Sequence, residues 1–118
     1  VAPLLFLKKE YSPGSAGKGK FRGGLGQVIE VTSAINEDMD LLASFDRIKY
    51  PARGRMGGEN GKAGYVRIKD KGILNGKGTQ LISAGDILQI YTPGGAGLGQ
   101  VKDRSEINLK YDKDNEMI

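Results

Sequence analysis

Residues 77–99 read KGTQLISAGDILQIYTPGGAGLG, and they combine the two features that decide the fold. In the first of these features, Leu88 and Ile90 alternate with Gln89 and Tyr91, which is the period of two that is typical of a β-strand. The second feature is the dense run of glycine that follows Thr92. Residues 77–99 therefore predict extended strands that continue into glycine-rich loops.

The rest of the chain repeats this arrangement. Its glycines fall into three clusters, at residues 14–26, 54–64 and 94–99, and segments rich in Val, Ile, Leu, Phe and Tyr lie between them. We predict strands at residues 3–8, 25–35, 41–47, 65–70, 79–82 and 87–92, a polar hairpin connection at residues 36–40 and a tight turn at residues 83–86. The expected fold class is all-β, an antiparallel sandwich or partly open barrel of about six short strands.

Length and composition predict one domain with a thin core. The chain has 118 residues, of which 38% are hydrophobic and 19 are glycine, so apolar side chains are concentrated in a few short elements. Strands that normally pack on another domain would expose apolar surface or pair with another copy of the chain. We expect a β domain at residues 1–100 and a charged C-terminal tail at residues 101–118.

The absence of two residue types excludes several classes of site. The chain contains no Cys and no His, so it cannot build a disulfide, a thiolate or histidine metal site, or a Ser-His-Asp triad. No apolar run approaches the roughly 20 residues that span a bilayer. The net charge of +4 is modest and alternates in sign along the chain, unlike a nucleic-acid surface. We expect a soluble, cytoplasmic protein that binds neither nucleic acid nor membrane.

The segment GSAGKGKF at residues 14–21 nearly matches a phosphate-binding P-loop. Phe21 stands where Ser or Thr would bind magnesium, and the glycines that follow oppose the helix that a P-loop requires. A structured turn is therefore the favoured interpretation. A free-standing module that binds an anion or a nucleotide phosphate is kept as an alternative function, with Lys20 as its test residue.

Three other blocks, FRGGLGQ (21–27), PARGRMGGENG (51–61) and TPGGAGLGQ (92–100), each carry a pair of glycines. Such pairs permit positive φ and close backbone approach, and neighbouring arginines supply bidentate donors to an anion. The alternative is that the glycines only shape turns and the arginines pair with Asp or Glu elsewhere. We predict positive φ in at least one member of each pair, no catalytic or metal-binding residue, and these candidate binding residues: Arg22, Gly23, Gly24, Arg53, Arg55, Gly57, Gly58, Gly94 and Gly95.

Taken in order, three blocks of the chain resemble the C-terminal part of the hydantoinase B/oxoprolinase family. They are SPGSAGKGKFRGGLG (12–26), DRIKYPARGRMGGENG (46–61) and residues 77–99, and the resemblance runs from about residue 11 to residue 99. The segment after Arg104 keeps little of the closing helix of that family. The family includes N-methylhydantoinase B subunits and subunits of acetone and acetophenone carboxylases.

The resemblance implies a segment of a larger, ATP-dependent assembly. Members of the family are several times longer and work with an A-type partner that handles ATP. Some of them open cyclic amides such as hydantoin and 5-oxoproline, and others add a carboxyl group to ketones. ATP and a divalent metal are thus implied for the parent complex, and no cofactor is expected in this chain. The expected partners are the remainder of the B-type subunit and the A-type subunit, and the expected role is accessory and structural, without catalysis by the chain alone.

Overall fold

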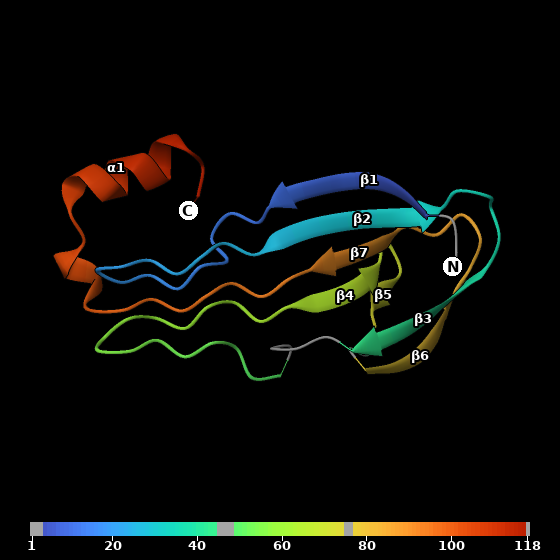
Figure 1. The fold of residues 1–118 in the computed structure, drawn as a ribbon, viewed down its shortest axis with the longest axis horizontal. Helices are drawn as coiled ribbons and strands as arrows, with labels where there is room; N and C mark the ends of the chain where they lie inside the picture. Colours follow the sequence, from blue (N-terminus) through green and yellow to red (C-terminus); the bar gives the residue numbers. More distant parts are fainter. Residues whose placement is uncertain (1–3, 45–48, 75–76, 118) are drawn as a thin grey trace.

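We describe residues 4–44, 49–74 and 77–117 of the chain in a computed structural model. Five strands form the larger sheet in the order β1-β2-β7-β4-β5, and two further strands, β3 and β6, form a second sheet (Figure 1). All neighbouring strands are antiparallel. The strand bounds are β1 Leu4–Tyr11, β2 Gln27–Ser33, β3 Met39–Ser44, β4 Tyr65–Ile68, β5 Gly72–Ile73, β6 Lys77–Ile82 and β7 Leu88–Tyr91. The fold class is therefore all-β, as predicted, and the described strands form an open sheet and no closed barrel.

The hydrophobic core that the described residues form lies between the two sheets. The alternation of β2, β7 and β4 directs one set of side chains to the second sheet. Ile82 of β6 is 1% exposed and packs in this cluster, with Met39 of β3 against it. The other buried members of the cluster are Val31, Val66, Ile68 and Leu88.

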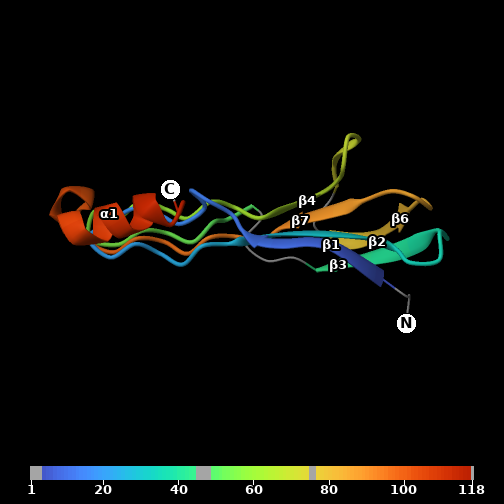
Figure 2. The same cartoon turned by 90° about the horizontal axis from the view of Figure 1, so that it is seen from above.

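The molecule is elongated because the glycine-rich segments extend away from the sheets. Its principal extents are 51 × 28 × 24 Å, and its radius of gyration is 16.6 Å, whereas a compact domain of this length has a radius of about 13–14 Å. The sheets occupy one end, and glycine-rich chain runs from β1, β2, β4 and β7 to the other end (Figure 1). Figure 2 shows that these extended segments form a thin layer.

The six predicted strands are confirmed, with bounds that shift by a few residues. Residues 45–47 of the third predicted strand lie outside the described residues. The structure adds β5, which the sequence analysis did not predict. The tight turn at residues 83–86 is also confirmed: the N–H of Asp86 donates to the carbonyl of Ser83 at 3.1 Å, and Gly85 has a φ of +84°.

The prediction of a hairpin connection at residues 36–40 is wrong. β2 and β3, which this segment joins, belong to different sheets: β2 pairs with β1 and β7, whereas β3 pairs with β6. The segment is held by other contacts. Asn36 has a φ of +54°, and the Asp38 carboxylate accepts a hydrogen bond of 2.7 Å from the N–H of Ala84. Residues 36–40 thus pass the chain from one sheet to the other beside the turn at residues 83–86.

The segment predicted as a charged tail contains two helices. A 3-10 turn at Val101–Asp103 leads to α1 at Glu106–Asp114, which lies alongside the glycine-rich segments (Figures 1 and 2). Ser105 caps α1 by accepting a hydrogen bond of 3.2 Å from the N–H of Asn108. The segment after Arg104, where we expected little of the family's closing helix, thus forms a helix of nine residues.

The described residues contain no helix long and apolar enough to cross a membrane.

Candidate functional site

The glycine-rich segments form one hydrogen-bonded body, which we call the glycine array and define as residues 12–26, 51–64 and 92–100. Residues 92–100 contact both other segments. The N–H of Gly17 donates to the carbonyl of Gly95 at 2.8 Å, and the N–H of Gly97 donates to the carbonyl of Glu59 at 2.9 Å. The N–H of Arg55 donates to the carbonyl of Gly97 at 3.1 Å. The three predicted glycine blocks are thus brought together in space.

Glycine is required in the array because backbones touch where a side chain would lie. A Cβ on Gly94 would overlap the carbonyl oxygen of Ser15, one on Gly58 would overlap that of Gly97, and one on Gly23 would overlap that of Gly95. Collagen uses glycine for the same reason, where chains meet too closely for any side chain. Gly24 differs, because a Cβ there would have no atom within 4 Å.

The prediction of positive φ in each glycine pair is correct for one pair only. Gly57 has a φ of +92°, and it follows Met56, which has a φ of +52°, at a tight reversal. Gly23, Gly24, Gly94 and Gly95 do not have positive φ. Most of the paired glycines therefore serve close packing of extended chain, and not turns as predicted.

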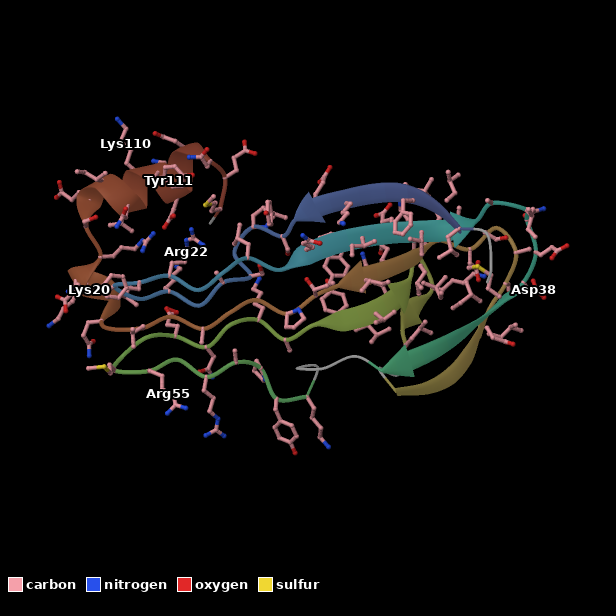
Figure 3. All side chains as sticks on the ribbon, viewed as in Figure 1. Lys20, Arg22, Asp38, Arg55, Lys110 and Tyr111 are labelled. Atoms are coloured by element: carbon pink, nitrogen blue, oxygen red, sulfur yellow. The ribbon has the colours of Figure 1, made fainter. Side chains whose placement is uncertain are left out.

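Arg22 is occupied inside the protein. Its Nε donates to the Asp112 carboxylate at 3.1 Å, and Arg104 contacts the other oxygen of the same carboxylate at 2.9 Å. Asp112 is 1% exposed, so this ion triad is buried between α1 and the array. Figure 3 shows Arg22 directed toward the helix. Arg22 thus follows the alternative interpretation, in which an arginine pairs with a distant acid.

Arg53 and Arg55 have a different environment. Both side chains are exposed, and neither makes an ion pair or a hydrogen bond with any residue that the structure describes. Arg55 projects away from the array, on the side opposite α1 (Figure 3). Both line a surface hollow of about 560 Å³, which is completed by Tyr50, Pro51, Ala52 and Asn60. We call it the arginine hollow.

Sequence reasoning missed two residues of these sites, Asp112 and Asn60. Asp112 lies in a run of mixed charges with no apolar periodicity, so nothing there indicated burial. Asn60 stands between Glu59 and Gly61 in the middle glycine block, and that position could have attracted attention because Asn often bonds nearby backbone. Its side-chain oxygen accepts a hydrogen bond of 2.9 Å from the N–H of Gly54.

The face of the larger sheet that points away from the core carries a polar row. The Glu30 carboxylate, which is 9% exposed, accepts a hydrogen bond of 2.7 Å from Gln89, and Gln89 in turn accepts one from Arg67. Next to this row, the rings of Tyr65 and Tyr91 stack with centroids 4.2 Å apart. Burial and the neighbouring Tyr91 raise the pKa of Tyr65 above its ordinary value. These groups satisfy one another where the array joins the sheet.

The segment that resembles a P-loop does not fit a nucleotide phosphate, and the described residues gather no acidic cluster that fits a divalent metal. In the segment that resembles a P-loop, the N–H groups of Gly14, Ser15, Gly17 and Lys20 all donate to backbone carbonyls, so they are not available to a phosphate. No helix follows this segment. No group of three acidic side chains is gathered as a metal site within residues 4–44, 49–74 and 77–117.

Comparison with known proteins decides the family. The family model described as hydantoinase B/oxoprolinase matches residues 1–101. The chain belongs to the hydantoinase B/oxoprolinase family. The match includes all seven strands and the whole glycine array, so the array is part of what this hydantoinase B/oxoprolinase chain shares with the family model.

Curated relatives agree with this membership. An uncharacterised protein of Methanocaldococcus jannaschii is 42% identical over 111 residues, which cover 91% of this chain and 19% of that protein. The 5-oxoprolinase 1 of Arabidopsis thaliana is 39% identical over 101 residues, which cover 82% of this chain and 8% of that enzyme. The 5-oxoprolinase of Saccharomyces cerevisiae is 38% identical over 106 residues, which cover 86% of this chain and 8% of that enzyme. The chain thus spans less than a fifth of the length of these relatives.

A solved structure shares the fold. The nucleotide-free structure of acetone carboxylase, from work on ATP-dependent acetone carboxylation, superposes with a TM-score of 0.69. The superposition covers 97% of this chain and 20% of that one, with 19% sequence identity. The fold of this hydantoinase B/oxoprolinase segment therefore also occurs as a part of a much larger chain.

Proposed function

We propose that the chain is the C-terminal accessory and structural segment of a hydantoinase B-type subunit. The parent enzyme is an ATP-dependent hydrolase of cyclic amides, of the hydantoin and 5-oxoproline class, or a related carboxylase. The family match supports this proposal, as does the small share of each relative that the chain spans. In this proposal the chain is not catalytic alone, and ATP and the divalent metal bind in the remainder of a cytoplasmic complex.

One observation carries the structural role: β1 presents an apolar surface that no other described residue buries. β1 pairs only with β2 in the described structure and so forms an edge of the larger sheet. All its residues are exposed, including Leu4, Leu5, Phe6 and Leu7, which are 45–62% exposed. An apolar edge strand of this length is a template for pairing with another strand. We propose that the remainder of the B-type subunit covers β1.

The direct test is an assay of the chain by itself. We expect that the isolated chain hydrolyses none of hydantoin, 5-oxoproline and ATP, because it has no His or Cys and because the N–H groups of Gly14, Ser15, Gly17 and Lys20 donate to backbone carbonyls. The assay should include the intact assembly of B-type and A-type subunits as the positive control. Turnover by the isolated chain at an enzymatic rate would refute the accessory role.

An assembly experiment tests the surface of β1. Phe6→Lys leaves the core untouched, because Phe6 is 62% exposed, but places a charge at the proposed contact. When the chain is co-expressed with the remainder of the subunit, we expect this variant to co-purify far less than the unmodified chain. Ile73→Lys is the matched control, because Ile73 is 73% exposed on β5, at the opposite edge of the sheet. Equal co-purification of both variants would contradict a contact through β1.

A further inference from the structure

We propose that the arginine hollow is a binding site for a small oxyanion, which is either a carboxylate or a phosphate group. This inference goes beyond the structural role proposed above and does not depend on it. The arginine hollow is a different place from the segment GSAGKGKF, whose likeness to a P-loop would suggest a phosphate site there.

The polar side chains that line the hollow are donors to an anion. The Arg53 and Arg55 guanidinium groups supply planar, bidentate donors that match the oxygens of carboxylate or phosphate. Tyr50 adds a hydroxyl group. No acidic residue lines the hollow within the part of the chain that the structure describes. A solvated arginine pair of this kind repels cations and attracts anions.

Asn60 is oriented by a hydrogen bond that leaves its own donor available. Because the N–H of Gly54 is a donor, the group that accepts from it at 2.9 Å must be the amide oxygen of Asn60. The side-chain NH₂ therefore lies on the other side of the amide. It has no hydrogen-bond partner among the described residues. Asn60 is thus the third residue of the hollow, after Arg53 and Arg55, that has nitrogen donors.

The glycine array fixes the backbone beneath these side chains. The N–H of Arg55 donates to the carbonyl of Gly97 at 3.1 Å, and the carbonyl of Arg55 accepts from Gly99 at 2.9 Å. The carbonyl of Ala52 accepts from Gly61 at 3.0 Å. The two arginines therefore extend from a backbone segment, residues 52–55, that is held at both ends. This lowers the conformational entropy that the protein loses when a ligand binds.

The size of the hollow suits a small molecule. Its volume of about 560 Å³ lies within the range of about 300–1,000 Å³ that is usual for small-molecule sites. Tyr50, Pro51 and Ala52 add apolar surface beside the donors. A compact dianion with a short carbon skeleton, or a diphosphate group, fits this combination of size and charge.

The test is titration of the 118-residue chain, followed by NMR of the backbone and arginine Nε–H signals. Succinate represents carboxylates and pyrophosphate represents phosphates, and ionic strength is kept constant with sodium chloride. We expect saturable shifts at Arg53, Arg55 and Asn60 with at least one of the two anions. The anion that binds more tightly identifies the class of ligand. No saturable shift with either anion would overturn the proposal.

Three variants separate this site from general attraction to positive charge. Arg55→Gln should weaken binding by about tenfold or more, the usual effect of losing a hydrogen bond to a charged group. Lys20→Gln removes the same charge at the P-loop-like segment and should change the Kd less than about twofold. Asn60→Asp keeps the acceptor for Gly54 but replaces the donor with a negative oxygen, so it should abolish binding in a folded chain. If Lys20→Gln weakens binding as much as Arg55→Gln does, the proposed location is wrong.

Discussion

Gly94→Ala is expected to lower the free energy of unfolding by roughly 3 kcal/mol or more, the upper end of what overpacking costs. The new Cβ would overlap the carbonyl oxygen of Ser15, which is backbone and cannot rotate away. Gly94 is buried, and its N–H also donates to the carbonyl of Lys62, so the segments have little room to separate. Urea denaturation followed by circular dichroism measures the change.

Gly24→Ala is the control for this substitution. Gly24 belongs to the same array, does not have positive φ, and has open space where its Cβ would lie. Alanine there should leave stability within about 0.5 kcal/mol or raise it slightly, because it restricts the unfolded chain. If the two alanine variants proved equally stable, close packing would not be the reason for these glycines.

Asp112→Ala is expected to destabilise the protein by about 3–5 kcal/mol, the usual cost of removing one partner from a buried ion pair. The substitution would leave the guanidinium groups of Arg22 and Arg104 without their shared carboxylate. Both groups are largely buried, because the Arg22 side chain is 20% exposed and the Arg104 side chain is 11% exposed. α1 would lose the one residue of its length that is buried. Thermal denaturation and the helical signal in circular dichroism both report this loss.

Asp114→Ala provides the comparison on the same helix. Asp114 is exposed and makes no ion pair within the described part of the chain, so its removal should change stability by less than about 0.5 kcal/mol. A similar loss of stability in both variants would show that charge on α1 matters and that the buried triad does not.

The strands were predictable because their signal is local. In β4 and β7 successive side chains point in turn to the core and to the opposite face, so the apolar residues recur with a period of two. The partner of each strand is not a local property. The sequence of residues 36–40 does not indicate that β2 and β3 belong to different sheets, because a short polar connection is equally compatible with a hairpin.

The helix could not be predicted from apolar periodicity because its anchor is a charge. Asp112 is the buried residue of α1, whereas Ile107, Leu109 and Tyr111 are exposed. The local signal that does exist is Ser105 followed by Glu106, which is a helix start. The pairing of Asp112 with Arg22, 90 positions earlier, depends on how the array folds back and is invisible in either segment alone.

The residue types of the candidate site are visible in the sequence, but their geometry is not. Doubled glycines permit close backbone approach, and the structure brings the three glycine blocks together. Their spacing did not reveal that Gly23 and Gly94 are needed for contact between backbones, because turns and close approach use the same residue. Nor did it distinguish Arg22, which is held by Asp112, from Arg53 and Arg55, which line the hollow.

Amide hydrogen exchange tests most directly whether the glycine-rich segments form a rigid, hydrogen-bonded scaffold. We predict that the N–H of Gly97, which donates to Glu59, and that of Gly95, which donates to Gly24, exchange as slowly as amides of β2 and β7. The N–H of Gly24, which has no partner within the described residues, should exchange rapidly and serves as an internal reference. Exchange at Gly95 and Gly97 as fast as at Gly24 would contradict the scaffold and leave these segments as open loops.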